Sequence, residues 1–122
     1  STAHANAALK QIQEENLMAN NKMIGDRVMT GAKKLMERFE VIGDVRGKGG
    51  MVGIEFVKDR EKKTPFTAAE FNPIMEELRE RGILIGRGGL GNTMRLQGPY
   101  CISADDVDYF LHSLEESLTE LH

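Results

Sequence analysis

Apolar residues recur at helical spacing over the first third of the chain, from about Ala5 to Phe39. They lie mostly three or four residues apart, or at multiples of that spacing, as on one face of an α-helix. The positions are Leu9, Ile12, Leu17, Ile24, Val28, Leu35 and Phe39. The pattern predicts a long N-terminal helix. Gly25 and Gly31 each cost such a helix about 1 kcal/mol relative to alanine, so we expect them to serve close packing against another surface.

The periodicity then changes to the alternation of β-strands. Val41–Arg46 is a short candidate strand, and in Met51–Val57 every second residue is apolar. The intervening Gly47–Gly50 favours a turn, which predicts an antiparallel hairpin. We expect the charged stretch Lys58–Pro65 to be an exposed connection.

A second helix is predicted before Gly82, with two equally good starts. Thr67 and Glu70 have the spacing of a capping box, whereas Asn72 as N-cap would place Pro73 at the first helical position. The apolar run Ile83–Ile85 after this helix is typical of a buried strand.

The remaining segments complete a two-layer fold. The glycine-rich loop Gly86–Gly91 leads to a strand over Thr93–Gln97, and Ser103 is a natural N-cap. The final helix carries an apolar stripe at Val107, Phe110, Leu111, Leu114, Leu118 and Leu121. We therefore predict one α+β domain over residues 1–122. It has an antiparallel or mixed sheet of about four strands, with a long N-terminal, a middle and a C-terminal helix packed on it.

Charge and composition exclude several classes of function. The 122 residues carry 16 basic and 19 acidic side chains, a net charge of −3, and these are interspersed along the chain. No basic patch indicates nucleic-acid binding, and no apolar run approaches the ~18 residues of a membrane span. The single cysteine, Cys101, cannot form an internal disulfide, which favours a reducing compartment. We interpret it as a small buried apolar residue.

Arg95 is the strongest candidate for chemistry. Alternation predicts that Met94 and Leu96 face the core, which leaves Arg95 on the opposite face beside the glycine-rich loop. A guanidinium in that position could bind a carboxylate through two hydrogen bonds. The spacing leaves a surface salt bridge as an alternative.

The other motifs give weaker indications of function. Gly47–Gly50 has neither the spacing of a P-loop nor that of a dinucleotide fingerprint. Asp105, Asp106 and Asp108 fit the acidic first turns of a helix better than a metal site. We predict a solvated His112, no metal site and no acid–base pair.

Three segments resemble class III aminotransferases, which are pyridoxal-phosphate enzymes of fold type I. They are Asp44–Glu55, then Glu80–Gly86 with the following Gly88-Gly89, and Asn92–Pro99 with Ile102-Ser103 and the final helix. Ser1–Leu17 is similar to the helix that follows the family's Gly-Gly-Asn-Pro motif. The loops are most similar to the branch of alanine–glyoxylate aminotransferase 2-like and 4-aminobutyrate aminotransferases. Gly98, where the family commonly has proline, and Pro73 depart from its pattern.

The resemblance implies that this chain is the C-terminal small domain of such an enzyme. In the family, the arginine at the position of Arg95 anchors the substrate carboxylate. The glycine-rich loop beside it, with Gly88, Gly89 and Asn92, is a candidate active-site loop, because glycine-rich loops often approach a ligand or another backbone. A flexible surface connection is the alternative. The catalytic lysine and the other residues that hold pyridoxal phosphate would lie in a large domain upstream. No lysine here matches the family's lysine motif, so we expect no catalytic or cofactor-binding residue in this chain.

The resemblance also implies the partners. They are an amino acid, a keto acid, the protein's own large domain and the second subunit of a homodimer, and not nucleic acid or membrane. An exposed apolar patch should mark where the large domain packs. We expect a cytoplasmic protein, or a mitochondrial one in a eukaryote, and no activity from the chain by itself. The alternatives are a standalone module that binds small carboxylates and a domain that dimerises through its N-terminal helix.

Overall fold

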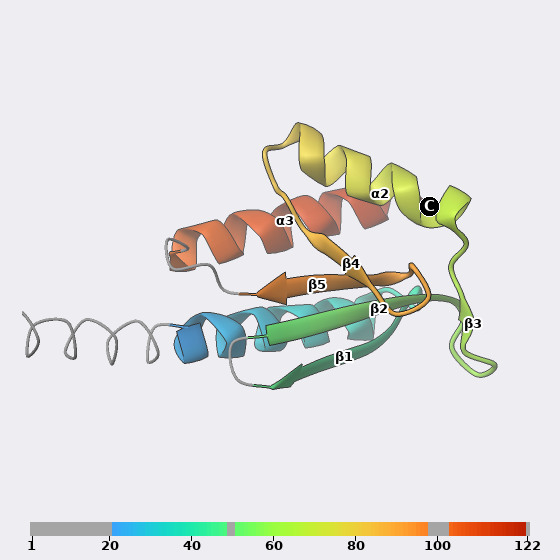
Figure 1. The fold of residues 1–122 in the computed structure, drawn as a ribbon, viewed down its shortest axis with the longest axis horizontal. Coiled ribbons are helices and arrows are strands. Elements are labelled where there is room, and N and C mark those ends of the chain that lie inside the picture. The colour runs from blue at the N-terminus through green and yellow to red at the C-terminus, as the bar shows by residue number, and fades with distance from the viewer. Residues whose placement is uncertain (1–20, 49–50, 98–102, 122) are drawn as a thin grey trace, which may run out of the picture.

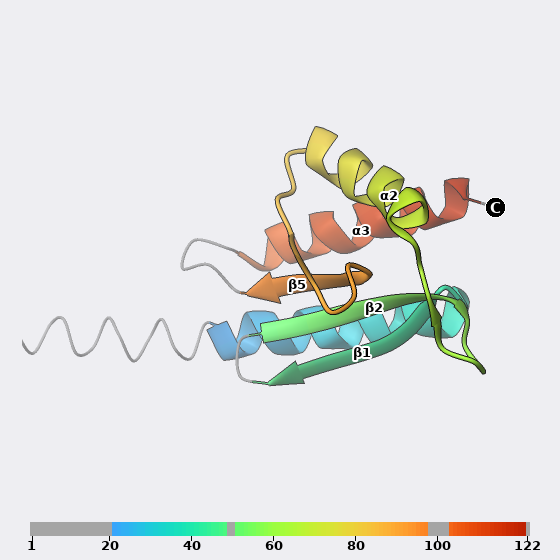
Figure 2. The same ribbon diagram turned by 45° about the vertical axis from the view of Figure 1, so that its right-hand side comes forward.

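The structure, a computed structural model, describes residues 21–48, 51–97 and 103–121. Helices cover one face of a five-stranded sheet, and the other face is left open (Figures 1 and 2). The strands are β1 (Ile42–Lys48), β2 (Met51–Asp59), β3 (Thr64–Pro65), β4 (Gly86–Gly88) and β5 (Thr93–Gln97). The helices cover residues 21–38, α2 (Ala68–Glu80) and α3 (Ala104–Glu120). The predicted α+β class and its two layers are confirmed.

The sheet is antiparallel at every pairing that the structure describes. Its strand order is β1-β2-β5-β4, and β3 pairs with the end of β2. The predicted hairpin of β1 and β2 is confirmed, with Val45 opposite Ile54 and an irregularity between Ile42 and Asp44. The short strand β3 lies inside the stretch that we expected to be a plain connection, because Pro65 pairs with Val57.

The core lies between the sheet and the helices. Alternate residues of β2 point into it, so that Val52, Ile54 and Phe56 are each at most 1% exposed. The ring of Phe56 contacts those of Phe66 and Phe71, with centroids 5.9 and 5.4 Å away. The α2 residue Phe71 is thereby packed onto the middle strand of the sheet.

The N-terminal helix packs on α3 through Gly31. A Cβ at Gly31 would lie 2.2 Å from Cδ1 of Leu111, so this glycine's packing partner belongs to the same domain. Arg27 reinforces the contact, because its Nη2 lies 2.7 Å from Oδ2 of Asp108. Residues 5–20 of the predicted helix lie outside the described residues.

Helix α2 starts at the first of the two predicted positions. Thr67 accepts from the Glu70 backbone N–H while the Glu70 side chain accepts from the Thr67 N–H, which is a complete capping box. Pro73 therefore lies inside the helix and not at its start. The helix ends at Glu80 with Arg81 as C-cap, and the next residue, Gly82, has a φ of +83°, which suits a residue without Cβ. The Ile83 N–H then bonds to the carbonyl of Leu78 at 2.9 Å, as in a Schellman motif.

Helix α3 begins as predicted and buries most of its stripe. Ser103 and Asp106 form a second capping box, which gives Asp106 a structural role. Four of the six predicted stripe residues are buried, and Leu111 is partly buried against the core: the four are Val107, Phe110, Leu114 and Leu118. Leu121 is 47% exposed because the helix has ended at the residue before it.

Two predictions between α2 and β5 are wrong. Ile83–Ile85 is not a strand, and its middle residue, Leu84, is 85% exposed. The following Gly86–Gly88, which we expected to be loop, forms β4 by pairing with β5. The apolar run was mistaken for core because two of its members, Ile83 and Ile85, do pack against the core from its edge.

Candidate functional site

The open face of the sheet carries a row of residues that are directly opposite one another on four strands. Arg46 of β1 pairs with Gly53 of β2, Gly53 with Arg95 of β5, and Arg95 with Gly86 of β4. Residues that are opposite one another across a sheet project from the same face. Arg95 is therefore flanked by a glycine on each side, so that no side chain in its own row crowds it.

Arg95 is exposed, as the alternation predicted, and Met94 on the opposite face is fully buried. The Nη2 atom of Arg95 lies 3.7 Å from Sδ of Met51, which is a weak hydrogen-bond acceptor. None of the carboxylates among the described residues forms an ion pair with Arg95. The alternative of a surface salt bridge, which the spacing allowed, is therefore not formed within the described part of the chain. By contrast, Nη1 of Arg46 lies 3.1 Å from Oδ2 of Asp44 and 3.5 Å from Oε2 of Glu55, and thus forms ion pairs with both.

Two hollows meet at Arg95. One of about 380 Å³ lies on the open face and is lined by Arg46, Lys48, Met51, Gly89, Thr93 and Arg95. The other, of about 720 Å³, extends from Arg95 and Met51 toward the helices and is largely apolar. Its apolar lining includes Ile24, Val28, Ile83, Leu84, Tyr109 and Phe110. A guanidinium at this junction can bind an anionic group while an apolar surface lies beside it.

The three predicted loop residues do not share one environment. Gly88 and Gly89 lie next to the side chains of Arg95 and Thr93. Asn92 is 1% exposed, and its Nδ2 donates to the carbonyl of Phe56 at 2.9 Å. The backbone carbonyl of Asn92 in turn accepts from the Phe56 N–H. Asn92 thus ties the turn between β4 and β5 to β2, and it does not line the hollow on the open face.

Sequence reasoning missed Met51 as a neighbour of Arg95. The two residues lie on adjacent strands, where Met51 pairs with Gln97 and Arg95 with Gly53. That relation follows from the register of β2 against β5, which alternation within one strand does not give. Thr93 lies on the same open face as Arg95 but is only 3% exposed. The turn at Gly89 covers it, and a Cβ there would lie 2.8 Å from Thr93 Oγ1.

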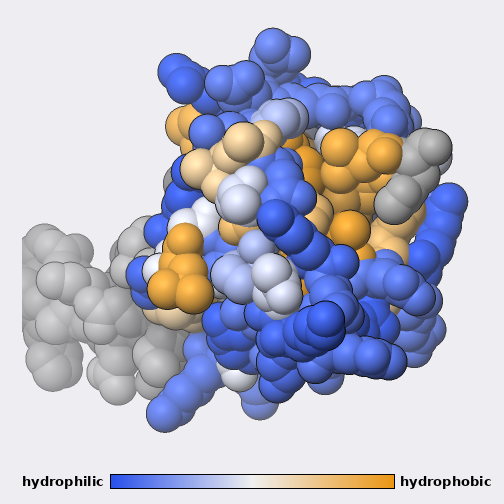
Figure 3. All heavy atoms as spheres, turned by 90° about the vertical axis from the view of Figure 1, so that its right-hand side faces the viewer, coloured by the Kyte–Doolittle hydropathy of each residue, from blue (hydrophilic) through white to orange (hydrophobic). Residues whose placement is uncertain are grey.

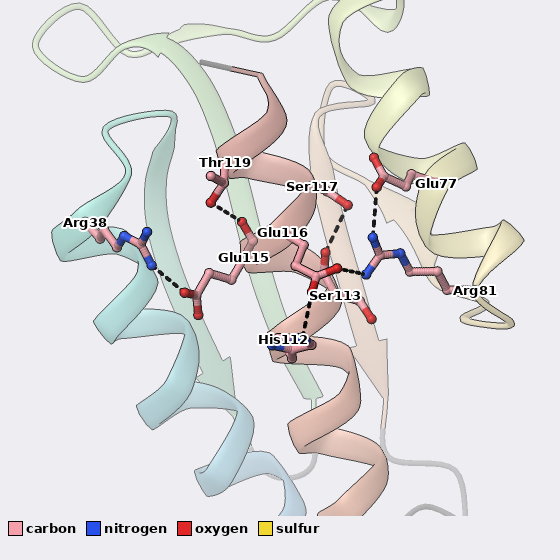
Figure 4. A network of polar contacts seen from close by, with 9 residues as sticks. All are labelled: Arg38, Glu77, Arg81, His112, Ser113, Glu115, Glu116, Ser117 and Thr119. Atoms are coloured by element: carbon pink, nitrogen blue, oxygen red, sulfur yellow. Dashed lines mark hydrogen bonds and ion pairs between the residues drawn. The ribbon is translucent and has the colours of Figure 1, made fainter.

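The remaining candidate residues belong to the helical layer (Figure 4). Oε2 of Glu116 accepts from Arg81 at 2.7 Å, and its Oε1 lies 2.7 Å from Nε2 of the exposed His112. The Arg81 hydrogen bond holds the pKa of Glu116 below its ordinary range, and that of Arg27 does the same for the pKa of Asp108. The Arg81–Glu116 and Arg27–Asp108 pairs join neighbouring helical segments, whereas His112 and Glu116 both belong to α3. Within the described segments, no three His, Cys, Asp or Glu side chains are grouped to hold a metal ion.

The described residues do not fit a site for an aldehyde cofactor held by a lysine. Such a lysine needs a desolvated pocket or a neighbouring cation that lowers its pKa. Every described lysine is exposed: Lys22, Lys33, Lys34, Lys48, Lys58, Lys62 and Lys63. Cys101 and Lys10 lie outside the described residues. No helix within the described part of the chain is long and apolar enough to cross a bilayer.

Residues 1–118 match the family model described as aminotransferase class-III. The chain is 40% identical over 122 residues to alanine–glyoxylate aminotransferase 2 homolog 2, mitochondrial, of Arabidopsis thaliana. That match covers 99% of this chain and 25% of the relative. The chain is also 36% identical to taurine–pyruvate aminotransferase of Bilophila wadsworthia, with 96% of this chain and 27% of that protein covered. The chain thus spans about a quarter of the length of these curated relatives.

Solved structures agree with the fold. A Bacillus anthracis aminotransferase superposes with a TM-score of 0.81 and 29% identity, covering 95% of this chain and 27% of that one. An amine transaminase of an uncultivated Pseudomonas species, solved in its PLP-bound internal aldimine form, gives a TM-score of 0.79 and 28% identity. That superposition covers 97% of this chain and 27% of the transaminase. The same three-helix and sheet arrangement is therefore one part of much longer chains.

Proposed function

The chain belongs to the class III aminotransferase family, and from that premise we propose that residues 1–122 form the C-terminal small domain of a pyridoxal-phosphate-dependent aminotransferase. The complete enzyme transfers an amino group between an amino acid and a 2-keto acid. Family membership over residues 1–118 and the superposition on aminotransferase chains support this proposal.

The task of this domain is to hold the substrate carboxylate through Arg95. The observation that carries the assignment is the state of its guanidinium, which is exposed on the open face and has no carboxylate partner among the described residues. Arginine presents two parallel N–H groups that match the two oxygens of a carboxylate. The neighbouring Arg46 is already engaged by Asp44 and Glu55, which leaves Arg95 as the better partner for an incoming anion.

The cofactor belongs to another part of the complete enzyme. Pyridoxal phosphate, when bound there, supplies the electron sink for chemistry at the amino-bearing carbon. Because the described lysines are all exposed, this domain contributes binding and orientation of the carboxylate and no covalent step. We expect the chain by itself to be inactive.

The apolar hollow beside Arg95 is the surface on which the enzyme's own large domain packs. Leu84 stands at its rim and is 85% exposed, and Tyr109 is 50% exposed. The end of the molecule that carries β3 is mostly hydrophilic, although it also shows one broad apolar area (Figure 3). The second subunit of a homodimer completes the assembly. We place the enzyme in the cytoplasm, or in the mitochondrion as the names of some relatives state.

Replacing Arg95 tests the assignment. Arg95→Met in the complete enzyme removes charge-assisted hydrogen bonds worth about 1.5–3 kcal/mol each, so kcat/KM should fall by roughly 100-fold with the melting temperature preserved. Arg46→Met is the matched control and should leave KM within about threefold, since its charge is already paired. Equal effects of the two changes, or unchanged kinetics for Arg95→Met, would refute the role of Arg95.

The domain assignment has its own test, which is the gene sequence upstream of the codon for Ser1. A continuous reading frame with a large domain and a candidate Schiff-base lysine supports the enzyme. A start codon immediately before Ser1 would overturn it in favour of a standalone module for small carboxylates.

A further inference from the structure

We propose that Gly88 is a positioning residue for Arg95, because its lack of a side chain creates the space in which the arginine stem lies. The inference rests on the proposed role of Arg95 in carboxylate binding. It assigns to β4 a function that is separate from contact with the substrate: the strand sets where the guanidinium is held.

The distances around Gly88 carry the proposal. A Cβ on Gly88 would lie 2.3 Å from Cδ of Arg95, 2.9 Å from its Cγ and 3.4 Å from its Nε. Real Cβ atoms essentially never approach heavy atoms within 3.0 Å. The middle of the arginine side chain therefore rests directly on the Gly88 backbone, and any larger residue at this position would force it into another rotamer.

The two glycines that flank Arg95 in its own row do not have this relation to it. A Cβ on Gly86 would lie 3.7 Å from Cβ of Arg95, at ordinary van der Waals distance. A Cβ on Gly53 would meet Thr93 at 3.6 Å and Arg46 at 3.7 Å, with no Arg95 atom among its nearest neighbours. The steric demand on the arginine stem is thus confined to Gly88, although all three glycines lie on the open face.

The effect of a side chain at Gly88 would not be backbone strain. Neither Gly86 nor Gly88 has a φ in the left-handed region, so an L-residue can adopt the backbone of β4 at both positions. The clash at Gly88 is with a flexible and exposed side chain, which can swing away at little cost. Alanine should therefore leave the fold intact and displace Arg95.

Displacing the Arg95 side chain should weaken carboxylate binding, because few other contacts hold its guanidinium in place. Among the described residues, its recorded polar contact is Sδ of Met51 at 3.7 Å, which is too weak to restore the orientation. Bidentate binding of a carboxylate requires the two N–H groups to be aimed correctly. A misplacement of about 1 Å in such a site can cost on the order of 100-fold in rate.

The experiment compares Gly88→Ala with Gly86→Ala in the complete enzyme. We expect Gly88→Ala to raise KM for the amino acid, and the inhibition constant of propionate, about tenfold or more, with kcat reduced less and the melting temperature unchanged. Gly86→Ala should leave both constants within about twofold of the parent. A crystal structure of the Gly88→Ala enzyme should show the Arg95 side chain moved away from β4.

A double-mutant cycle separates this inference from the proposed function. In an Arg95→Met background, Gly88→Ala should have no further effect on propionate binding, because the stem that it displaces no longer carries a guanidinium. If Arg95→Met weakens binding but Gly88→Ala matches Gly86→Ala, the positioning role is wrong while the carboxylate site stands. If Arg95→Met itself has no effect on propionate binding, the proposed function fails first.

Discussion

Leu111 of α3 covers Gly31 of the N-terminal helix so closely that a Cβ at Gly31 would lie 2.2 Å from the Leu111 Cδ1. Gly31 costs its helix about 1 kcal/mol in helix propensity relative to alanine. The close packing of α3 that the glycine allows compensates for this cost. The apolar stripe of α3 can then bury Val107 and Leu114 in the same core. The position of α3 is therefore set by the absence of a side chain on the neighbouring helix.

Gly31→Ala should destabilise the domain despite the higher helix propensity of alanine. Overpacking typically costs 1–3 kcal/mol, which outweighs the gain of about 1 kcal/mol from propensity, so we expect a net loss of about 1 kcal/mol in the free energy of unfolding. Urea denaturation measures it. In a Leu111→Ala background the same substitution should be neutral or stabilising, and a loss that persisted there would contradict this explanation.

Arg60 stabilises the end of the N-terminal helix. Its Nη2 donates to the carbonyl oxygens of Met36, Phe39 and Ile42 at 2.7, 3.1 and 3.1 Å, where a cation also complements the helix dipole. Arg60→Met should lower the free energy of unfolding by about 1–3 kcal/mol. Lys62→Met, an exposed cation in the same connection, is the control and should change it by less than about 0.5 kcal/mol. Equal losses of unfolding free energy in the two variants would show that the effect comes from net charge and not from the hydrogen bonds of Arg60.

The sequence predicts those features of this fold that depend on neighbouring residues. Alternation from Met51 to Val57 identifies the hairpin, and Ser103 identifies the start of α3. For α2 the sequence offered two starts, at Thr67 and at Asn72, and the structure has the one at Thr67. The features that it misses depend on distant partners. The strand β3 exists because the end of β2 offers backbone groups to Pro65 and its neighbour.

The same limit applies to the candidate site. Alternation correctly placed Arg95 on the face opposite Met94. The relation of Arg95 to Gly88 and Met51 needs the register of three strands, which the periodicity of a single strand does not contain. Leu84 was assigned to the core because an apolar run has the same pattern whether it faces a core or a partner domain.

Asn92 should contribute to stability and not to substrate affinity. Its Nδ2 is a buried donor to the Phe56 carbonyl at 2.9 Å. Asn92→Ala removes this hydrogen bond, but the carbonyl still accepts from the Phe66 N–H at 3.1 Å, so we expect a loss of about 0.5–1.5 kcal/mol in the free energy of unfolding. Asn92→Asp should be at least as destabilising, because it loses the donor and buries a charge. If either variant of the complete enzyme is well folded but binds propionate tenfold more weakly, Asn92 belongs to the site after all.

The contact between Arg81 and Glu116 makes part of the domain's stability depend on pH. The hydrogen bond from Arg81, together with the charge of His112, lowers the pKa of Glu116 from its ordinary value of 4.5. The folded state therefore binds this proton less readily than the unfolded chain does. The contribution is complete above about pH 4.5 and is lost as the pH falls through the lowered pKa of the folded state.

Glu116→Gln removes this dependence. At pH 7 the variant should unfold at a lower urea concentration than the parent. The difference should be smaller at pH 3, which lies below the ordinary pKa of 4.5 for Glu116 in the unfolded chain. Glu76→Gln on α2, an exposed glutamate with no ion pair recorded among the described residues, is the matched control and should follow the parent at both values. A Glu116→Gln difference of the same size at pH 3 and pH 7 would show that the side chain stabilises α3 by packing and not through its charge.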